Sequence, residues 1–344
     1  MTSFVVLGAG WRAEMFWRLA AALPDVDCLG AVVRTPRDLP VPTFASLDEV
    51  RPDFVVTAVP WAVTPGLVGE LVERGVRVLA ETPPAPDLDG LRTLWHQTGE
   101  SGLVQIAEQY TRVPAHAARL ALVRSGVIGE PTRADVSSTH QYHAVSLIRA
   151  FLGIGREPVE VRAVRTTAPL ADPLSRAGWA DPVEVKQATT TVATLSFAGG
   201  GFGVYDFTDN QWHNQLLNRR LLVRGTTGEL RDQDVIRLAA DRTIVRTPVV
   251  RRQTGYDLDL DGYDTDHITF GSDVLYRNPY QGQRWNDEEI AIATLIEDTA
   301  AWATDDGPAP YPLADGCHDH CVALAIEEAA DRGGVVQVAE EPWH

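Results

Sequence analysis

Two histidines and a tyrosine lie close together in the polar segment 137–143, Ser-Ser-Thr-His-Gln-Tyr-His. An imidazole titrates near neutral pH, so it can take a proton from a hydroxyl group or return one. An apolar stretch with helical spacing follows and ends at Gly153. We therefore predict that His143, at the start of this helix, is a general acid or base, and that His140 and Tyr142 are further catalytic residues. In the competing interpretation, His143 only bonds backbone groups at the helix start.

Two glycines near the N-terminus have the spacing of a phosphate-binding turn. Residues 4–7 are all apolar, which predicts a strand buried on both faces, and the apolar spacing after residue 14 predicts a helix. Between them, Gly8 allows a tight turn and Gly10 lets a ligand approach the backbone, while Ala13 takes the third position of the Gly-x-Gly-x-x-Gly pattern. Unpaired N–H groups at a helix start suit a pyrophosphate. The segment therefore predicts a dinucleotide site rather than a purely structural turn.

The second predicted strand, over residues 28–33, ends in Arg34-Thr35-Pro36-Arg37. Turns that bind NAD usually carry an acidic residue there for the ribose 2′-hydroxyl, whereas an arginine suits a 2′-phosphate or stacks on adenine. The sequence thus favours NADP and leaves NAD open, because Arg34 could stack on the adenine of either. The residues that we expect to contact the cofactor are Gly8, Gly10, Trp11, Arg12, Arg34, Thr35, Arg37, Ala58, Pro60, Trp61, Glu81 and Thr82.

The first third of the chain alternates predicted strands with predicted helices. The strands are expected at residues 4–7, 28–33, 54–59, 76–80 and 103–107. This order predicts an α/β Rossmann fold, a doubly wound parallel sheet whose ligand crevice lies at the carboxyl ends of its strands. We place this domain at residues 1–112.

The pattern changes in the remainder, residues 113–344, which we expect to form an α+β domain. Helices are expected from Pro114 to Gly126, from Asn286 to Ala303 and over residues 313–332. The strands predicted without helices between them indicate an open antiparallel sheet. They are residues 159–167, 189–197, 202–208 and 221–225.

The formal net charge is −17, from 47 acidic and 30 basic residues. Such an acidic balance argues against nucleic acid or an anionic membrane as a partner. The three cysteines, Cys28, Cys317 and Cys321, do not form an even framework, and no stretch resembles a signal peptide or a spanning helix. We expect a reduced, cytoplasmic setting.

Two stretches contain residue types that bind metal ions, but neither predicts a metal site. The run Cys317-His-Asp-His-Cys321 places its metal-binding residue types on a helix face that continues into a core stripe with Leu324, which favours buried thiols over zinc. The run Asp257-Leu-Asp-Leu-Asp-Gly262 resembles the opening of a calcium loop. Its bidentate glutamate would fall at position 268, which is Ile268, so a solvated acidic loop is the better interpretation.

Several motifs follow the Rossmann half in a recognisable order. They are Val-Leu-Ala-Glu-Thr-Pro-Pro at 78–84, a proline-started helix closing on Ser-Gly-Val-Ile-Gly-Glu-Pro at 125–131, the His143-led helix, and Leu-x-x-Arg-Gly-Thr-Thr-Gly at 221–228. Together they resemble the glucose-fructose oxidoreductase and inositol dehydrogenase family, Gfo/Idh/MocA, over nearly the whole chain. The resemblance implies an NAD(P) domain followed by an open-faced sheet, which supplies the substrate wall and often the interface of a homodimer or higher homo-oligomer. It also implies hydride transfer at a carbinol carbon of a small sugar, cyclitol or polyol.

The active residues of the family are only partly present. Its Glu-Lys-Pro motif aligns with Glu81-Thr82-Pro83, and Lys186 is the only lysine of the chain. Its Asp-x-x-x-His pair aligns with Thr139 and His143. Losing a cation that stabilises developing alkoxide can cost ~10²–10³ in rate, so another donor is expected. Beside the catalytic candidates, the residues that we predict to contact the substrate are Tyr110, Arg112, Trp212 and His213.

Three functions are compatible with this set of residues. The first is an NAD(P)-dependent oxidoreductase with His143 as acid or base. The second is an enzyme that keeps its nicotinamide bound and uses transient oxidation for elimination, epimerisation or glycoside cleavage. The third is a non-catalytic protein that binds the cofactor, which the absence of the family's lysine and aspartate allows.

Overall fold

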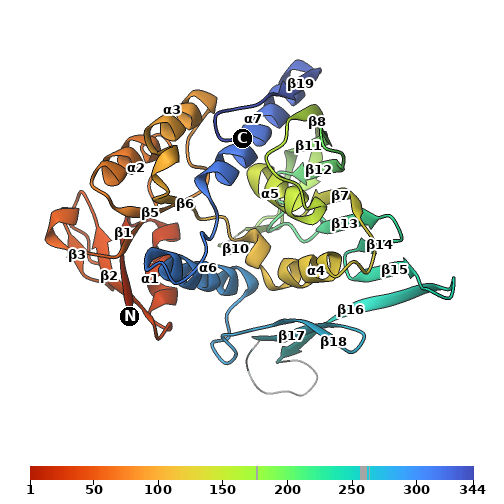
Figure 1. The fold of residues 1–344 in the computed structure, drawn as a ribbon, viewed down its shortest axis with the longest axis horizontal. Helices are drawn as coiled ribbons and strands as arrows, with labels where there is room; N and C mark the ends of the chain where they lie inside the picture. Colours follow the sequence, from red (N-terminus) through yellow and green to blue (C-terminus); the bar gives the residue numbers. More distant parts are fainter. Residues whose placement is uncertain (176, 256–261, 263) are drawn as a thin grey trace.

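The computed structural model describes residues 1–175, 177–255, 262 and 264–344. The acidic residues 257, 259 and 261 of the stretch considered for calcium lie outside these residues. The chain builds two large sheets, one from its N-terminal part and one from its middle and C-terminal parts (Figure 1).

The first sheet has six strands in the order β3-β2-β1-β4-β5-β6, all paired in parallel. The predicted doubly wound Rossmann sheet is therefore confirmed. Its five predicted strands are present, and the sixth, the two-residue edge strand β3, is too short to leave a pattern in the sequence. The strands are β1 (Thr2–Leu7), β2 (Val26–Val32), β3 (Thr43–Phe44), β4 (Phe54–Thr57), β5 (Arg77–Ala80) and β6 (Val104–Ile106).

Helices cover both faces of this sheet, which is why its central strands are apolar on both sides. The face with Val5 and Val55 packs with α2 (Thr64–Glu73) and α3 (Leu88–Thr98). The opposite face packs with α1 (Trp11–Ala20) and α6 (Asp287–Ala303), a helix from the far end of the sequence that lies beside α1 (Figure 1). The start of α6 is fixed by a capping box, because Asn286 accepts from the backbone of Glu288 and Glu289 while the Glu289 carboxylate accepts from its N–H.

The second sheet has eleven strands in the order β18-β17-β16-β15-β14-β13-β7-β12-β11-β8-β19. Among the described strands, its pairs are antiparallel except for β7 with β12, so the predicted open antiparallel sheet is confirmed with this one parallel pair. The strands are β7 (Pro131–Ser137), β8 (Val159–Ala171), β11 (Val185–Phe197), β12 (Phe202–Thr208), β13 (Arg220–Gly225), β14 (Gly228–Arg231), β15 (Asp234–Leu238), β16 (Ile244–Thr254), β17 (Asp264–Phe270), β18 (Asp273–Arg277) and β19 (Val335–Val338). A small separate hairpin is made by β9 (Leu174–Ser175) and β10 (Gly178–Trp179).

Three helices pack on one face of the second sheet. They are α4 (Pro114–Arg124), α5 (Gln141–Leu152) and α7 (Leu313–Arg332). A short 3₁₀ helix, η3 (Tyr110–Arg112), joins the two sheets directly after β6. Alternate residues of the strands point into the helices, as in β8, where Val159 and Val161 are buried and Arg162 is exposed.

The helix α7 holds the cysteine and histidine run as buried residues. Cys317, His318, His320 and Cys321 are all buried, and the two cysteines carry free thiols. Within the described ranges, no group of three or more His, Cys, Asp or Glu side chains is arranged to hold a metal ion. In the same part of the chain, no helix combines the length and apolar character needed to span a membrane.

Candidate active site

The turn from β1 into α1 is built around two glycines with different roles. Gly8 has a φ of +123°, and a Cβ added there would lie 2.3 Å from the carbonyl oxygen of Ala58, so only glycine fits. Gly10 is the N-cap of α1, and no side chain caps the helix. A Cβ on Gly10 would meet nothing within 4 Å. No capping side chain therefore occupies the start of α1, where a ligand could approach the backbone.

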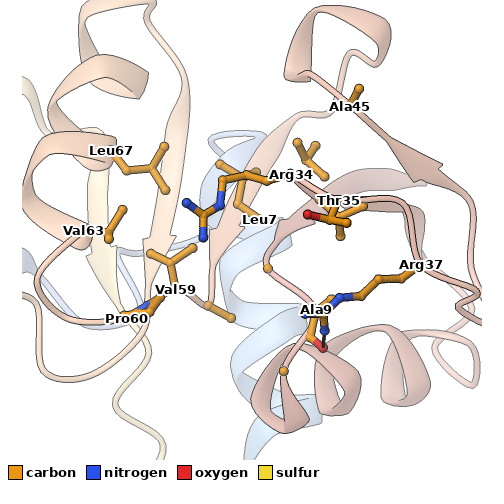
Figure 2. Close-up of a pocket in the computed structure, with 15 residues that line it drawn as sticks. Leu7, Ala9, Arg34, Thr35, Arg37, Ala45, Val59, Pro60, Val63 and Leu67 are labelled. Atoms are coloured by element: carbon orange, nitrogen blue, oxygen red, sulfur yellow. Dashed lines mark hydrogen bonds between the residues drawn. The ribbon is translucent and has the colours of Figure 1, made fainter.

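A cavity of about 670 Å³ adjoins this turn (Figure 2). Thr35 and Arg37, which follow β2, lie on one side in Figure 2, the residues after β4 lie on the other, and the Arg34 side chain extends between them. Apolar walls with a few cations suit an adenine nucleotide. The lining residues are Leu7, Gly8, Ala9, Gly10, Val32, Val33, Arg34, Thr35, Arg37, Ala45, Ala58, Val59, Pro60, Val63 and Leu67.

Five of the residues predicted to contact a cofactor do not line this cavity. Trp11 and Trp61 are each about half exposed, at 46% and 52%. Arg12 is held by two carboxylates, with Nε 2.7 Å from Glu81 Oε1 and Nη1 3.0 Å from Glu288 Oε1. Their contacts with a cofactor stay predictions, as does that of Thr82.

His143 is paired with a carboxylate that the sequence interpretation missed. Its Nδ1 lies 2.6 Å from Oε2 of Glu108, and both side chains are buried. Glu108 is the second residue after β6, and its other oxygen, Oε1, accepts a hydrogen bond from the Tyr110 backbone N–H at 3.0 Å. The Tyr110 ring lies 4.3 Å from the His143 ring, centroid to centroid. A carboxylate and an imidazole are thus enclosed together at the end of a strand.

Burial makes charge costly on both partners of this pair. It raises the pKa of Glu108 to about 8. Burial, with the nearby Arg12 charge, lowers the pKa of His143 well below its usual range. The pair therefore favours a carboxylic acid beside a neutral imidazole near pH 7, with one proton between them.

The start of α5 connects this pair to the carboxyl ends of the parallel strands. The Tyr142 side chain lies close to that of Thr82, the second residue after β5. Glu81, its neighbour, holds Arg12 in the first turn of α1, the helix that adjoins the cavity. His143 therefore lies at the same edge of the first sheet as the glycine turn.

A second cavity of about 380 Å³ opens on the other side of His140. The His140 ring lies 5.2 Å from the His143 ring and 4.7 Å from the Trp212 ring. The walls of this second cavity combine two carboxylates, an arginine, hydroxyls and aromatic rings, which suits a ligand with many hydroxyl groups. The lining residues are His140, Gln141, Arg165, Thr189, Thr191, Tyr205, Phe207, Asp209, Trp212 and Glu327.

Of the predicted substrate residues, only Trp212 lines this second cavity. His213 follows it without lining the cavity, and Tyr110 packs on His143. Arg112 binds other parts of the chain, donating to Asp298 at 2.7 Å and to the Pro310 carbonyl oxygen at 2.9 Å. The substrate contacts of Tyr110, Arg112 and His213 stay predictions.

The position of Glu108 offers one signal that the sequence did contain. It directly follows the fifth predicted strand, so it had to lie at the carboxyl edge of a parallel sheet, where ligands bind. Arg165 and Glu327 left no comparable signal, because they are ordinary charged residues on the long strand β8 and on α7.

No protein-family model and no curated protein sequence matches the chain. Solved structures match it over nearly its whole length. An oxidoreductase from Agrobacterium radiobacter, in complex with NAD⁺, L-tartaric acid and magnesium, has 14% identity and a TM-score of 0.68, over 97% of this chain and 98% of that one. A myo-inositol dehydrogenase from Corynebacterium glutamicum has 17% identity and a TM-score of 0.64, over 99% of both chains. The chain has the Gfo/Idh/MocA fold.

A levoglucosan dehydrogenase in complex with NADH and levoglucosan shows the same likeness, with 17% identity and a TM-score of 0.68 over 99% of this chain and 100% of that one. At these identities the likeness establishes the fold, which the sequence resemblance implied. Thr139, which the sequence resemblance aligns with the family's aspartate, is fully buried. The carboxylate beside His143 comes from Glu108 instead.

Proposed function

We propose that the protein is an NAD(P)-dependent oxidoreductase that moves hydride between nicotinamide and a carbinol or ketone carbon of a sugar, cyclitol or polyol-like molecule. The observation that carries this proposal is one sheet edge with an uncapped glycine turn at β1 and a buried histidine–carboxylate pair at β6. The structural relatives that hold NAD⁺ with tartaric acid, or NADH with levoglucosan, support the cofactor and the substrate class.

The residues of the first cavity fit the cofactor. The helix start after Gly10, which no side chain caps, would receive its pyrophosphate, and Arg34 and Arg37 would lie near its adenosine end. When bound, the nicotinamide supplies the hydride acceptor or donor. His143 removes the hydroxyl proton during oxidation and returns it during reduction, and Tyr142 donates a hydrogen bond to the reacting oxygen.

The second cavity is the proposed space for the rest of the substrate. Trp212 offers an aromatic face to the C–H side of a sugar ring, and Arg165 and Asp209 offer partners for hydroxyl groups. His140 would separate these contacts from His143. We also propose that the face of the second sheet left uncovered by helices joins two copies of the chain, and that residue 112 ends the cofactor domain.

The purified protein, mixed with NADP or NAD and a panel of sugars and polyols, should reduce the cofactor with at least one of them. The absorbance of the reduced nicotinamide measures this directly. Substrate turnover without net reduction, with cofactor retained through gel filtration, would instead show redox-neutral chemistry. Tight cofactor binding without turnover of any polyol would contradict the enzymatic proposal.

Gly10→Val should weaken cofactor binding by about tenfold or more without unfolding the protein. A Cβ at this position meets no protein atom, so only a bound ligand would collide with the new side chain. Calorimetric titration with NADP and NAD measures the affinity, and the melting temperature checks the fold. Gly66→Val is the matched control, since a Cβ there also meets nothing within 4 Å. Unchanged affinity in Gly10→Val would place the cofactor elsewhere.

Arg34→Ala should raise the Kd for NADP by about tenfold and change the Kd for NAD much less. An arginine that bonds a 2′-phosphate loses a charged hydrogen bond of about 1.5–3 kcal/mol on truncation. Titrations of wild type and variant with both cofactors give the two ratios. An equal loss for NADP and NAD would mean that Arg34 stacks on adenine and confers no preference.

A further inference from the structure

We propose that Glu108 and His143 accept the substrate proton as one unit, in which Glu108 takes the Nδ1 proton of His143 while Nε2 receives the proton of the substrate hydroxyl. The proposal rests on the proposed function for its substrate. Glu108 is then a positioning residue that acts through His143, and it occupies the role left open at Thr139.

The geometry restricts the pair to this arrangement. The 2.6 Å contact joins Oε2 of Glu108 to Nδ1 of His143, which leaves Nε2 as the ring nitrogen available to a substrate. The backbone N–H of Tyr110 fixes the second carboxylate oxygen, so the carboxyl group cannot rotate away without losing that bond. Tyr110 also packs its ring on His143 and thereby restrains the imidazole.

Burial explains why the histidine needs this partner. Because burial lowers the pKa of His143, an isolated imidazole at this position would hold a proton poorly near pH 7. Burial raises the pKa of Glu108, so the carboxylate readily takes a proton instead. Passing the Nδ1 proton to Glu108 keeps the imidazole neutral after Nε2 has been protonated.

Charged and titratable groups from several elements surround Glu108 and His143. Arg12 is already neutralised by two carboxylates, and Arg112 is paired with Asp298. The surrounding groups are Arg12 of α1, Glu81 after β5, Tyr110 and Arg112 of η3, His140 and Tyr142 at the start of α5, Glu288 of α6, and Tyr311 before α7.

The proton balance of the oxidation closes within the pair. Before reaction, Glu108 is a carboxylate, Nδ1 carries the ring hydrogen, and Nε2 has a free lone pair. The substrate O–H bond breaks and an Nε2–H bond forms, while the Nδ1–H bond breaks and a Glu108 O–H bond forms. The carbinol carbon becomes a carbonyl carbon, since its hydride leaves to the oxidised nicotinamide of the proposed function. Reduction reverses each of these changes.

Nitrogen-15 NMR of the histidine rings tests the pair without any turnover. As the pH rises through about 8, Glu108 should lose its proton, and His143 should change from the Nε2–H to the Nδ1–H tautomer while staying neutral. The His143 signals are identified as those missing from His143→Gln. Glu108→Gln should abolish this change, because the amide cannot titrate. A wild-type tautomer that is constant from about pH 6 to about pH 10, or an unchanged transition in Glu108→Gln, would overturn the proposal.

The kinetic arm separates this proposal from the proposed function. Wild-type kcat/KM for oxidation should rise with pH around 8, and Glu108→Gln should lower kcat by about 10²-fold and remove that inflection. Glu108→Asp should restore part of the rate. Glu297→Gln, which makes the same change at a half-buried glutamate bonded to Tyr280, should keep the wild-type profile. If no polyol is oxidised, the proposed function fails. The tautomer change measured by NMR still shows whether Glu108 and His143 share the Nδ1 proton.

Discussion

His143→Ala should lower kcat for polyol oxidation by about 10²–10⁴-fold and leave cofactor affinity within about twofold of wild type. Alanine removes the ring nitrogen to which we assign the hydroxyl proton, and His143 does not line the cavity that we assign to the cofactor. Steady-state rates with saturating NADP or NAD, together with a cofactor titration, measure both quantities.

The control for this variant is His96→Ala, which removes an exposed histidine from α3 and should change neither rate nor affinity. Activity that persists undiminished in His143→Ala would show that another group handles the proton. The nearest candidates would then be Tyr142 and His140, which lie beside it at the start of α5.

Arg149→Met should destabilise the fold by about 3–5 kcal/mol. The Arg149 guanidinium binds Asp319 at 2.5 Å and Asp315 at 2.8 Å, and both Arg149 and Asp319 are buried. Methionine fills similar space and leaves the Asp319 carboxylate without its cation. The free energy of unfolding from a urea titration, taken with the midpoint and slope, measures the loss.

The deficit of Arg149→Met should depend on pH. Burial raises the pKa of Asp319 to about 6 even with Arg149 present, so loss of the cation raises it further. The carboxyl group of the variant is therefore neutral at low pH, and the deficit should grow as the pH rises above about 6.

Arg156→Met is the control for this buried network, since Arg156 shares Asp315 but is one-third exposed and should cost under about 1 kcal/mol. Adding Asp319→Asn to Arg149→Met should recover part of the loss, because the uncompensated charge is removed. A cost for Arg149→Met as small as that of Arg156→Met would contradict the interpretation.

Elements with strong local signals were predictable from the sequence. The strand 202–208 and the helix that begins after Asn286 have the predicted bounds. Neighbouring residues carry both signals, the alternating burial of the strand and the capping box of the helix. The strands β14 to β18 were not predicted. Many of their outward residues are apolar or half exposed, as at Ile236 and Ile244, so the alternation that marks a half-buried strand is weak there.

The candidate site divides in the same way. The glycine turn could be predicted because Gly8 and Gly10 act through their own backbone. The partner of His143 could not, because Glu108 is distant in sequence and reaches it only once β6 and α5 have been brought together. The sequence resemblance aligns Thr139 with the family's aspartate and so indicates a missing carboxylate. The folded chain brings the Glu108 carboxylate to His143 instead.

The packing of α6 on α1 has a consequence for how the protein is made. Met15 and Phe16 of α1 belong to the same hydrophobic cluster as Ile292 and Ile296 of α6, and the backbone N–H of Ile106 on β6 donates to the Tyr311 carbonyl. A nascent chain that has left the ribosome only as far as the first sheet still exposes these α1 residues and lacks that bond. The half of the chain that contains the first sheet can therefore reach its final packing only late in synthesis, and until then chaperones that shield apolar surface would be expected to bind it.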